Sequence, residues 1–591
     1  MDSPAVPTRR VRGESGLAVR VRDHALRLPL QTWFLLLVFA PILLMVVYSI
    51  WRSDGGVTVH DWTTNNYSDV ISSPTYRLLL WRTLYTATAA AALATLIAFP
   101  MAYFVSRRLR RYRMVAIVLV IIPLWVSMLL RIFAWKIILG DHGILNSALL
   151  EIGAINTPSS AFLYTRFTVL LTLTYVAIPF VFITSYSALE RIPPSLIEAS
   201  YDSGAGSWPT FRNVVWPLAK QGVAIGFGLA LLLAIGDYLT PSLVGGLSGT
   251  MLGSVIASQF GLVGNWPLGA AMAITLLLAV GLLLLVGAWF VRSEGVLEAD
   301  AGVAMRPEAW RGASVGDRAR SAISWAAFIL PYLFLYLPLL VIIVFSFNDS
   351  DVQVLPLAGF TTRWYDALLS DTALMAALRR TLLVGVGSVA IGTVVGTYFA
   401  LIFANTRNRG MTILKAGLTL PVLLPGMVLG LALAITFREA GFQFGIPTIM
   451  VGHATFVTPV IMLVILARLR RLDPSLAQAS MDCGAGHLRT FWYVILPQIR
   501  SALIGAALLG FTLSFDEIIV TYFLSGSEPT LPVYIWNQLR FGFTPKINAI
   551  FSLIGVASLV VVLIAGRVLR SELRTEGPVA PRSAAAPSLS A

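Results

Sequence analysis

Ionisable and aromatic side chains inside long apolar stretches are the residues of this sequence that could do chemistry. Charged groups are costly at membrane depth, so they commonly mark the path of a substrate or an ion. Carboxylates in such a place could attract a cationic amine, and tryptophan or tyrosine could offer it a cation–π face. The alternative puts the acids near span ends, hydrogen-bonded to backbone at a helix break, and leaves the aromatic rings to packing. The candidates for a substrate pathway are Asp237, Tyr238, Ser514, Asp516, Glu517, Trp125 and Trp135.

Two of these acids, Asp237 and Asp516, occupy matching places in the two halves of the chain. We therefore expect both to approach a pseudo-twofold axis. Arg131 and Lys136 lie close to Trp135 in the sequence and would instead suit an anion. The sign of the charge that such a pathway accepts stays open.

Residues for the common catalytic and metal sites are missing. A Walker A loop needs a lysine that follows a glycine, and none of the four lysines in the sequence does so. The single cysteine, Cys483, excludes an intramolecular disulfide and a multi-cysteine metal site within this sequence, and the five histidines show no HExxH pair. We expect no catalytic residue, no metal site and no cofactor bound by this chain, and hence no enzyme.

Composition explains where the candidates lie. Of 591 residues, 57% are hydrophobic and only 12% are charged, against roughly 25% charged residues in a soluble domain. A helix needs about 20 apolar residues to cross the hydrocarbon core, and about twelve such stretches occur. We therefore expect an all-α polytopic membrane protein. The stretches lie near 30–51, 79–105, 114–139, 165–189, 219–243, 267–291, 323–346, 380–404, 412–437, 447–467, 501–524 and 547–567.

The net charge of +14 sits in short runs between these stretches. Lysine and arginine favour the cytoplasmic side of a membrane, and their distribution places both termini there. The expected units are a basic tail (1–29), a first six-span module (30–291), a cytoplasmic linker (292–322), a second six-span module (323–567) and a disordered tail (568–591).

A loop between the fourth and fifth span of each module is duplicated. The first copy begins at Pro194 within the loop 190–218, and the second begins at Pro474 within the loop 468–500, 280 residues later. Six spans separate the copies, so both loops face the cytoplasm and the modules are parallel repeats.

Each copy predicts a short helix with a defined start and end. A serine followed three residues later by Glu or Gln predicts a capping box, and a glycine in the left-handed conformation commonly ends a helix. The expected capping pairs are Ser195 with Glu198 and Ser475 with Gln478, and the expected terminating glycines are Gly204 and Gly484.

The segments that run from Glu198 to Gly204 and from Gln478 to Gly484 resemble the EAA loop of the membrane subunit of type I ABC importers. The resemblance implies a permease fold in a bacterial inner (plasma) membrane, with two copies of an ABC ATPase subunit and an extracytoplasmic substrate-binding protein as partners. ATP and Mg would be used by the ATPase, and no nucleic acid is involved. The residues it assigns to ATPase coupling are Glu198, Ala199, Asp202, Gly204, Gln478, Ala479, Asp482 and Gly484.

Other stretches resemble the polyamine (spermidine/putrescine) branch of that family. Segments 122–132, 236–246 and 265–271 are similar to one permease subunit, and segments 345–348, 360–365, 513–519 and 531–535 are similar to its partner subunit. The resemblance implies that two subunits are fused in this chain. It also implies import by alternating access, in which two ATPases close on ATP and draw the two short helices together.

The sequence departs from that pattern at two places. Gln478 stands where the family usually has Glu, which removes one possible charged contact to an ATPase. Pro425 and Gly426 stand where a polyamine subunit typically carries an acid, which weakens the inference of a cationic substrate.

The main alternative function is an ion-coupled secondary transporter with twelve spans in two parallel halves, and an importer of a small anion is a further alternative.

Overall fold

The computed structural model describes residues 27–109, 111–291, 317–351, 353, 357–406, 409–541, 545–557 and 560. The expected disordered tails, most of the expected linker and the end of the last expected span lie outside these residues. Within them, nine helices are long and apolar enough to cross a membrane, and two bent helix pairs raise the number to eleven. A shorter apolar helix, Lys546–Ala557, lies where the sequence predicts the twelfth span. The predicted all-α polytopic fold is confirmed.

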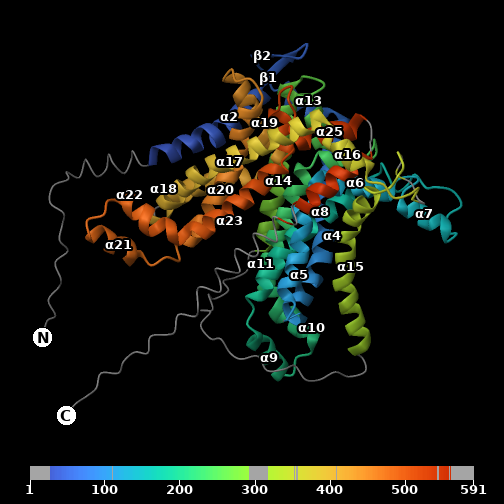
Figure 1. Cartoon of the computed structure of the whole chain (residues 1–591), viewed down its shortest axis with the longest axis horizontal. Coiled ribbons are helices and arrows are strands. Elements are labelled where there is room, and N and C mark those ends of the chain that lie inside the picture. The colour runs from blue at the N-terminus through green and yellow to red at the C-terminus, as the bar shows by residue number, and fades with distance from the viewer. Residues whose placement is uncertain are drawn as a thin grey trace.

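The long helices and the loop helices follow the same order in the two halves of the chain, and the first half adds β1, β2, η2 and α7 (Figure 1). The first half contains η1 (Leu35–Phe39), α2 (Ala40–Ser49), β1 (Trp51–Asp54), β2 (Val57–Trp62), α3 (Asn65–Ser72), α4 (Pro74–Arg108), α5 (Arg113–Ile121), η2 (Ile122–Trp125), α6 (Met128–Leu139), α7 (Ile144–Glu151), α8 (Arg166–Glu190), α9 (Pro194–Asp202), α10 (Ser207–Thr210), η3 (Phe211–Val215), α11 (Trp216–Gly236), α12 (Leu239–Val244), α13 (Leu252–Phe260) and α14 (Trp266–Val291). The second half contains α15 (Asp317–Phe345), α16 (Arg363–Leu369), α17 (Thr372–Asn405), α18 (Arg409–Leu423), α19 (Gly426–Glu439), α20 (Ile446–Leu469), α21 (Pro474–Asp482), α22 (His487–Thr490), η4 (Phe491–Ile495), α23 (Leu496–Phe515), α24 (Ile519–Leu524) and α25 (Leu531–Phe541).

Two spans end earlier than the apolar pattern predicts. The expected fifth span reaches residue 243, but α11 ends at Gly236, and the expected eleventh span reaches residue 524, but α23 ends at Phe515. Each helix is interrupted where acidic residues follow, and a short helix, α12 or α24, continues the chain. Helical breaks of this kind are tolerated at membrane depth where the protein itself satisfies the freed backbone groups.

The first helix of each half packs against the other half. The helix that ends in α2 lies on α19 and α14, and the ring of Phe34 fills the place of a side chain at Gly417, where an added Cβ would come within 2.5 Å of it. In return, α15 lies on α4 and α6, and the hydroxyls of Tyr332 and Tyr336 donate hydrogen bonds to the carbonyls of Ala116 and Leu119. The halves are therefore interlocked.

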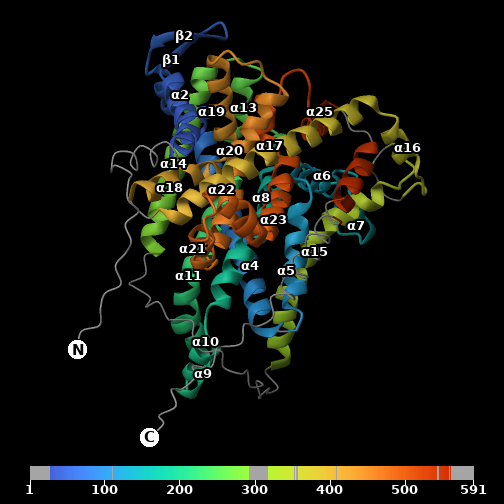
Figure 2. The same ribbon diagram turned by 60° about the vertical axis from the view of Figure 1, so that its left-hand side comes forward.

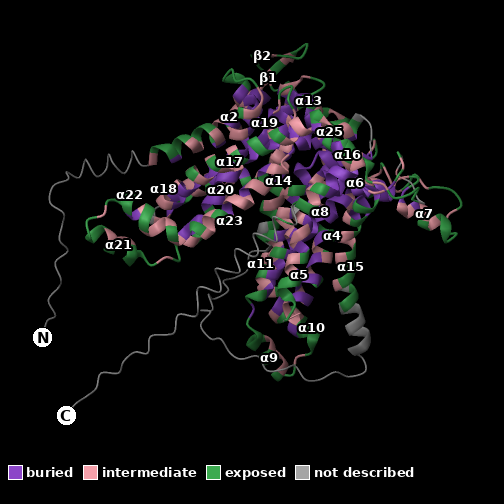
Figure 3. Ribbon diagram, viewed as in Figure 1, coloured by how far each residue is buried: buried purple, intermediate pink, exposed green. Residues whose placement is uncertain are grey.

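The two helical bundles meet at one end and separate at the other. The bundle of α4, α8 and α11 ends at α9, and the bundle of α17, α20 and α23 ends at α21, far from α9 in both views (Figures 1 and 2). Buried residues concentrate where the bundles meet (Figure 3). We call that end the hairpin end, because the strands β1 and β2 project from it.

The antiparallel hairpin of β1 and β2 is an element that the helical periodicity does not predict. Its turn contains Gly55 and Gly56, both with positive φ (56° and 85°). A turn with two left-handed residues matches the twist of the flanking strands. The sequence Asp54-Gly55-Gly56 between strand-forming residues was the available signal.

The duplicated loop forms the same structure twice, with a start that differs from the prediction. Each helix begins at a proline, so Ser195 and Ser475 lie inside the first turn, and neither forms the expected capping box. In α9 the residue before the helix is Pro193, which offers no side-chain cap. In α21 it is Asp473, whose carboxylate accepts the backbone N–H of Ser475. The hydrogen bonds from the backbone and the side chain of Ser475 hold the pKa of Asp473 below its usual range.

The predicted end of both helices is confirmed. Gly204 and Gly484 have φ of +81° and +86°. In the first copy the N–H of Gly204 bonds to the carbonyl of Tyr201, and that of Ala205 bonds to the carbonyl of Ser200. The second copy repeats both bonds, which together form a Schellman motif. The other glycine of each copy, Gly206 or Gly486, is extended with negative φ instead.

A serine–threonine pair closes each loop. The hydroxyl of Ser200 lies 3.0 Å from that of Thr210, and the hydroxyl of Ser480 lies 3.0 Å from that of Thr490. Both threonines are buried. The fold of the loop therefore explains why both copies have the same serine and the same threonine at these positions.

Alanine at Gly484 tests this helix end. The space around Gly484 is open, so the cost of a Cβ is the left-handed conformation itself, about 1 kcal/mol. We expect backbone amides of α21 to exchange with solvent about fivefold faster in Gly484→Ala, because tenfold corresponds to about 1.4 kcal/mol. The control is Gly505→Ala within α23, also in open space, which should not speed exchange. Equal protection of α21 in wild type and Gly484→Ala would contradict the proposed role.

Candidate functional site

Asp237 is a buried helix cap. It follows α11 directly, and its Oδ1 accepts the backbone N–H groups of Leu239 and Thr240 at 2.8 and 2.9 Å. The Thr240 hydroxyl donates to Oδ2. The carboxylate thus satisfies the first turn of α12, which is one of the two roles that the sequence left open.

Glu517 has the same role in the second half. Its Oε1 accepts the backbone N–H of Val520 at 2.9 Å, in the first turn of α24. The structural counterpart of Asp237 is therefore Glu517, 280 residues later, as in the duplicated loops. The expected pairing of Asp237 with Asp516 is wrong by one residue, because two adjacent acids made either alignment possible.

Asp516 connects the halves. Its Oδ2 accepts the backbone N–H of Met128, the first residue of α6, at 3.0 Å, and the Ser127 hydroxyl also bonds to it. Its counterpart in the first half is Gly236, where an added Cβ would lie 2.9 Å from the Cβ of Pro425, just before α19. A carboxylate therefore caps α6, while no side chain caps α19.

A buried arginine accompanies these acids. Arg131 of α6 is 6% exposed and interacts electrostatically with Asp516 and Asp237. Opposite charges inside an apolar bundle reduce the cost of burying each one. The two acids therefore offset part of the charge of Arg131, although among the described residues neither lies within ion-pair distance of it and its Nε is buried without a hydrogen bond.

Ser514 belongs to a buried polar network. Its hydroxyl lies 2.7 Å from Nδ1 of His453 and 3.0 Å from the Ser388 hydroxyl. The Nε2 of His453 lies 2.8 Å from the hydroxyl of Thr521. The network joins α17, α20, α23 and α24 around the break in the eleventh span. Sequence analysis missed His453, for which a single histidine in an apolar span was the only signal.

The predicted aromatic residues separate in the structure. Trp135 is buried against Tyr175 and Phe334, with ring centroids at 5.8 and 5.1 Å. The side chain of Trp125 lies outside the described part of the chain. Of the candidates whose side chains the structure describes, Tyr238 alone lines either of the two cavities described next. The pathway role of all these candidates, Tyr238 included, stays a prediction.

The cavity beside Tyr238 lies between the halves near the hairpin end. Its volume is about 300 Å³, and α6, α12, α13, α24 and α25 contribute to its walls. Two of its lining residues, Lys136 and Arg540, are basic, and none of the residues found to line it is acidic. We call it the basic cavity.

A second cavity of about 440 Å³ shares Tyr522 with the basic cavity. Its walls include several aromatic residues: Phe260, Trp266, Phe444, Tyr522 and Phe523. We call it the aromatic cavity. Among the described residues, no cluster of His, Cys, Asp or Glu could hold a metal ion in either place.

The duplicated loops expose the residues expected to contact a partner. Glu198 and Asp202 in α9, and Gln478 and Asp482 in α21, are exposed to solvent. Large apolar side chains accompany them: Trp208 is 68% exposed and Leu488 72% exposed. Exposed apolar groups beside charged ones are typical of surfaces that bind another protein.

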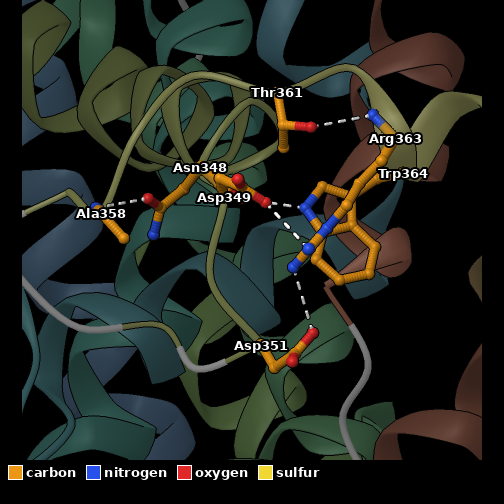
Figure 4. A network of polar contacts seen from close by, with 7 residues as sticks. All are labelled: Asn348, Asp349, Asp351, Ala358, Thr361, Arg363 and Trp364. Atoms are coloured by element: carbon orange, nitrogen blue, oxygen red, sulfur yellow. Dashed lines mark hydrogen bonds and ion pairs between the residues drawn. The ribbon is translucent and has the colours of Figure 1, made fainter.

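Two stretches that carried the resemblance to a known family contact one another after α15. Trp364 donates its indole N–H to the carbonyl of Asn348 at 2.9 Å, while Arg363 forms ion pairs with Asp349 and Asp351 (Figure 4). The guanidinium of Arg363 also lies over the Trp364 ring, 4.3 Å from its centroid. These contacts fix the segment that follows the first helix of the second half.

Comparison with known proteins supports this reading of the fold. Residues 94–293 and 388–571 match the family described as binding-protein-dependent transport system inner membrane component. The putrescine transport system permease protein PotI of Escherichia coli K12 is 37% identical over 234 residues, 38% of this chain and 83% of that protein. The spermidine/putrescine transport system permease protein PotB of Haemophilus influenzae is 34% identical over 256 residues, 43% of this chain and 89% of that protein.

Among solved structures, a bacterial alginate ABC transporter chain has 17% identity and a TM-score of 0.40, over 47% of this chain and 98% of that chain. The family match covers most of the chain and occurs once in each half. The protein belongs to the family of binding-protein-dependent transport system inner membrane components, as a multi-pass protein of the inner membrane in which two family units are joined.

Proposed function

We propose that this chain is the fused permease of an ATP-driven ABC importer that moves a small amine-bearing solute into the cytoplasm by alternating access. The observation that carries the proposal is the pair of loops with the same helix end and the same serine–threonine pair, one per family unit, each presenting an exposed helix. The amine assignment is supported by the relatives, whose names identify putrescine and spermidine as their substrates.

The energy source is a separate ATPase. The chain has no Walker A sequence, so ATP and Mg are bound by partner subunits and this chain is not itself an enzyme. Two equivalent loop helices, α9 and α21, fit two copies of the ATPase. In this proposal a substrate-binding protein docks on the opposite, hairpin end, and the loops and both termini lie in the cytoplasm.

The proposed motion follows from the separation of the loop helices. Closure of two ATPases on ATP draws α9 and α21 together. The bundles then rock about the interlocked region where the first helices cross over, and the cavities near the hairpin end open to the outside. Hydrolysis reverses the motion.

The energy source can be tested by uptake into cells that carry the complete transporter. We expect uptake of radiolabelled putrescine to persist when an uncoupler removes the proton gradient and to stop when ATP is depleted. The opposite pattern would establish an ion-coupled secondary transporter and overturn the proposal.

Positive charges introduced into the loop helices test the ATPase contact. We expect the double variant Glu198→Arg, Gln478→Arg to weaken co-purification of the ATPase and ATP-dependent uptake about tenfold or more, which corresponds to about 1.4 kcal/mol. Glu151→Arg is the matched control, because Glu151 is also exposed but lies in α7, away from both loops. Unchanged ATPase binding by the double variant would remove these residues from the interface.

Paired substitutions at Asp516 separate capping from a role in the pathway. Asn retains an oxygen that can accept the Met128 N–H, while Ala removes it, and a lost helix cap typically costs about 1 kcal/mol. We expect Asp516→Asn to retain uptake and Asp516→Ala to lower the thermal stability of the purified protein. Loss of uptake in stably folded Asp516→Asn would instead place the charge in the substrate pathway.

A further inference from the structure

Two arginines of the first half hold the loop between α12 and α13, which lies toward the hairpin end (Figures 1 and 2). Arg82 of α4 donates hydrogen bonds from Nη1 to the carbonyls of Leu247 and Thr250. Arg166, the first residue of α8, donates from Nε to the carbonyl of Ser248 at 2.9 Å. The two guanidinium groups are close enough to repel each other.

The second half contains a counterpart of Arg82. In each half the arginine is followed by a threonine whose hydroxyl accepts a backbone N–H from later in that half, at 2.8 Å from Leu252 to Thr83 and at 2.7 Å from Leu531 to Thr381. Arg82 and Arg380 therefore occupy equivalent positions. Each also donates from Nη1 to the carbonyl two residues before that N–H, which belongs to Thr250 or Pro529.

The two equivalent arginines differ in their charge partners. The Nε of Arg380 lies 3.2 Å from a carboxylate oxygen of Glu528. At the matching place in the first half stands Gly249, which has no side chain. Among the residues that the structure describes, no carboxylate lies within ion-pair distance of Arg82 or Arg166. The loop carbonyls accept hydrogen bonds, but they leave two positive charges without a counter-charge.

Terminal nitrogens of both guanidinium groups are available to a ligand. Arg166 is exposed, and its Nη1 and Nη2 have no acceptor within the described part of the chain. Arg82 is half-buried. Its Nε is enclosed, whereas its Nη2 is neither enclosed nor hydrogen-bonded to a described residue. Neighbouring guanidinium groups with free donors match the oxygens of a phosphate group.

The position of Arg82 along α4 corresponds to a headgroup layer of the membrane. Arg82 lies about 39 Å along the helix axis from Arg108, the last residue of α4. The hydrocarbon core of a bilayer is about 30 Å thick, and about 40–45 Å with both headgroup layers. With the basic end of α4 at Arg107 and Arg108 in one headgroup layer, Arg82 lies in the other.

The surface beside Arg82 suits contact with lipid. Leu78, Trp81 and Tyr85 are all exposed, and their spacing puts them on one side of α4. Tryptophan and tyrosine are enriched where a membrane protein meets the headgroup layer. Leu247, whose carbonyl Arg82 binds, is 96% exposed. A molecule held by the two arginines would therefore be bordered by side chains that favour acyl chains.

We propose that Arg82 and Arg166 bind the phosphate group of an anionic phospholipid in the headgroup layer at the hairpin end. The phosphate oxygens accept hydrogen bonds from the guanidinium nitrogens and supply the charge that Glu528 supplies to Arg380. A headgroup without an ammonium group is preferred, because a cation would face two arginines. The site requires only that the chain lies in a membrane, so it is independent of the proposed solute and energy source.

Native mass spectrometry of the full-length protein in detergent tests the site. We expect short-chain phosphatidylglycerol to bind about tenfold or more tightly than phosphatidylcholine of the same chain length. Arg82→Gln with Arg166→Gln should abolish this preference, whereas Arg380→Gln, which removes the arginine that Glu528 already neutralises, should retain it. Equal binding of both lipids by wild type, or an unchanged preference in the double variant, would overturn the proposal.

Inorganic phosphate separates a lipid site from a site for free phosphate. We expect an equal concentration of inorganic phosphate to leave the bound phosphatidylglycerol in place, because it makes no contact with the apolar border of the site. Displacement of the lipid by inorganic phosphate would overturn the assignment to a phospholipid.

A further variant keeps both arginines and supplies the missing charge. Ser248 is exposed, and its carbonyl already accepts the Nε–H of Arg166. Ser248→Glu should place a carboxylate beside the arginines and abolish the preference for phosphatidylglycerol, while Ser248→Gln should retain it. Thermal unfolding without added lipid checks that each variant is folded. An unchanged preference in folded Ser248→Glu would overturn the site, whether or not the double Gln variant folds.

Discussion

The need to satisfy backbone N–H groups at helix starts inside an apolar bundle governs the centre of this protein. In a membrane no water is available for these groups, and each one left without an acceptor is costly. Three helices that begin in the interior, α6, α12 and α24, each meet a carboxylate there, from Asp516, Asp237 and Glu517 respectively. The broken spans therefore explain why acids occur at this depth, without any reference to a substrate.

The same constraint decides the sign of the charge that lines the basic cavity. The start of a helix carries a partial positive charge, so a carboxylate that caps it is compensated locally. Arg131 adds a further compensating charge beside Asp516 and Asp237. With the acids occupied in this way, the charges that reach the cavity surface are those of Lys136 and Arg540. A count of charged residues near Tyr238 in the sequence would suggest the opposite sign.

Features of the fold that depend on residues close together in the sequence were predictable, and features that depend on residues far apart in the sequence were not. The left-handed glycines of the duplicated loops follow from residues within one turn, and the apolar spans follow from composition. The capping boxes failed because a proline at the first helical position moved Ser195 and Ser475 into the helix. The basic cavity combines residues as far apart as Lys136 and Arg540, and no local pattern brings them together. Trp536 and Arg540 share a helix face, but only the contact between the rings of Trp536 and Tyr238 shows what that face lines.

A continuous structural path joins the loop helices to the cavity in each half. In the first half, α9 is tied to α10 through Ser200 and Thr210, and α10 continues through η3 into α11. The α11 helix, 21 residues or about 30 Å long, ends at the break where Asp237 holds α12 and places Tyr238 in the cavity wall. Because the first helix of each half packs against the other half, a force on α9 cannot simply separate the halves. In the proposed importer it must instead be transmitted along α11 to the break, where the position of Tyr238 changes relative to Trp536 on the other half.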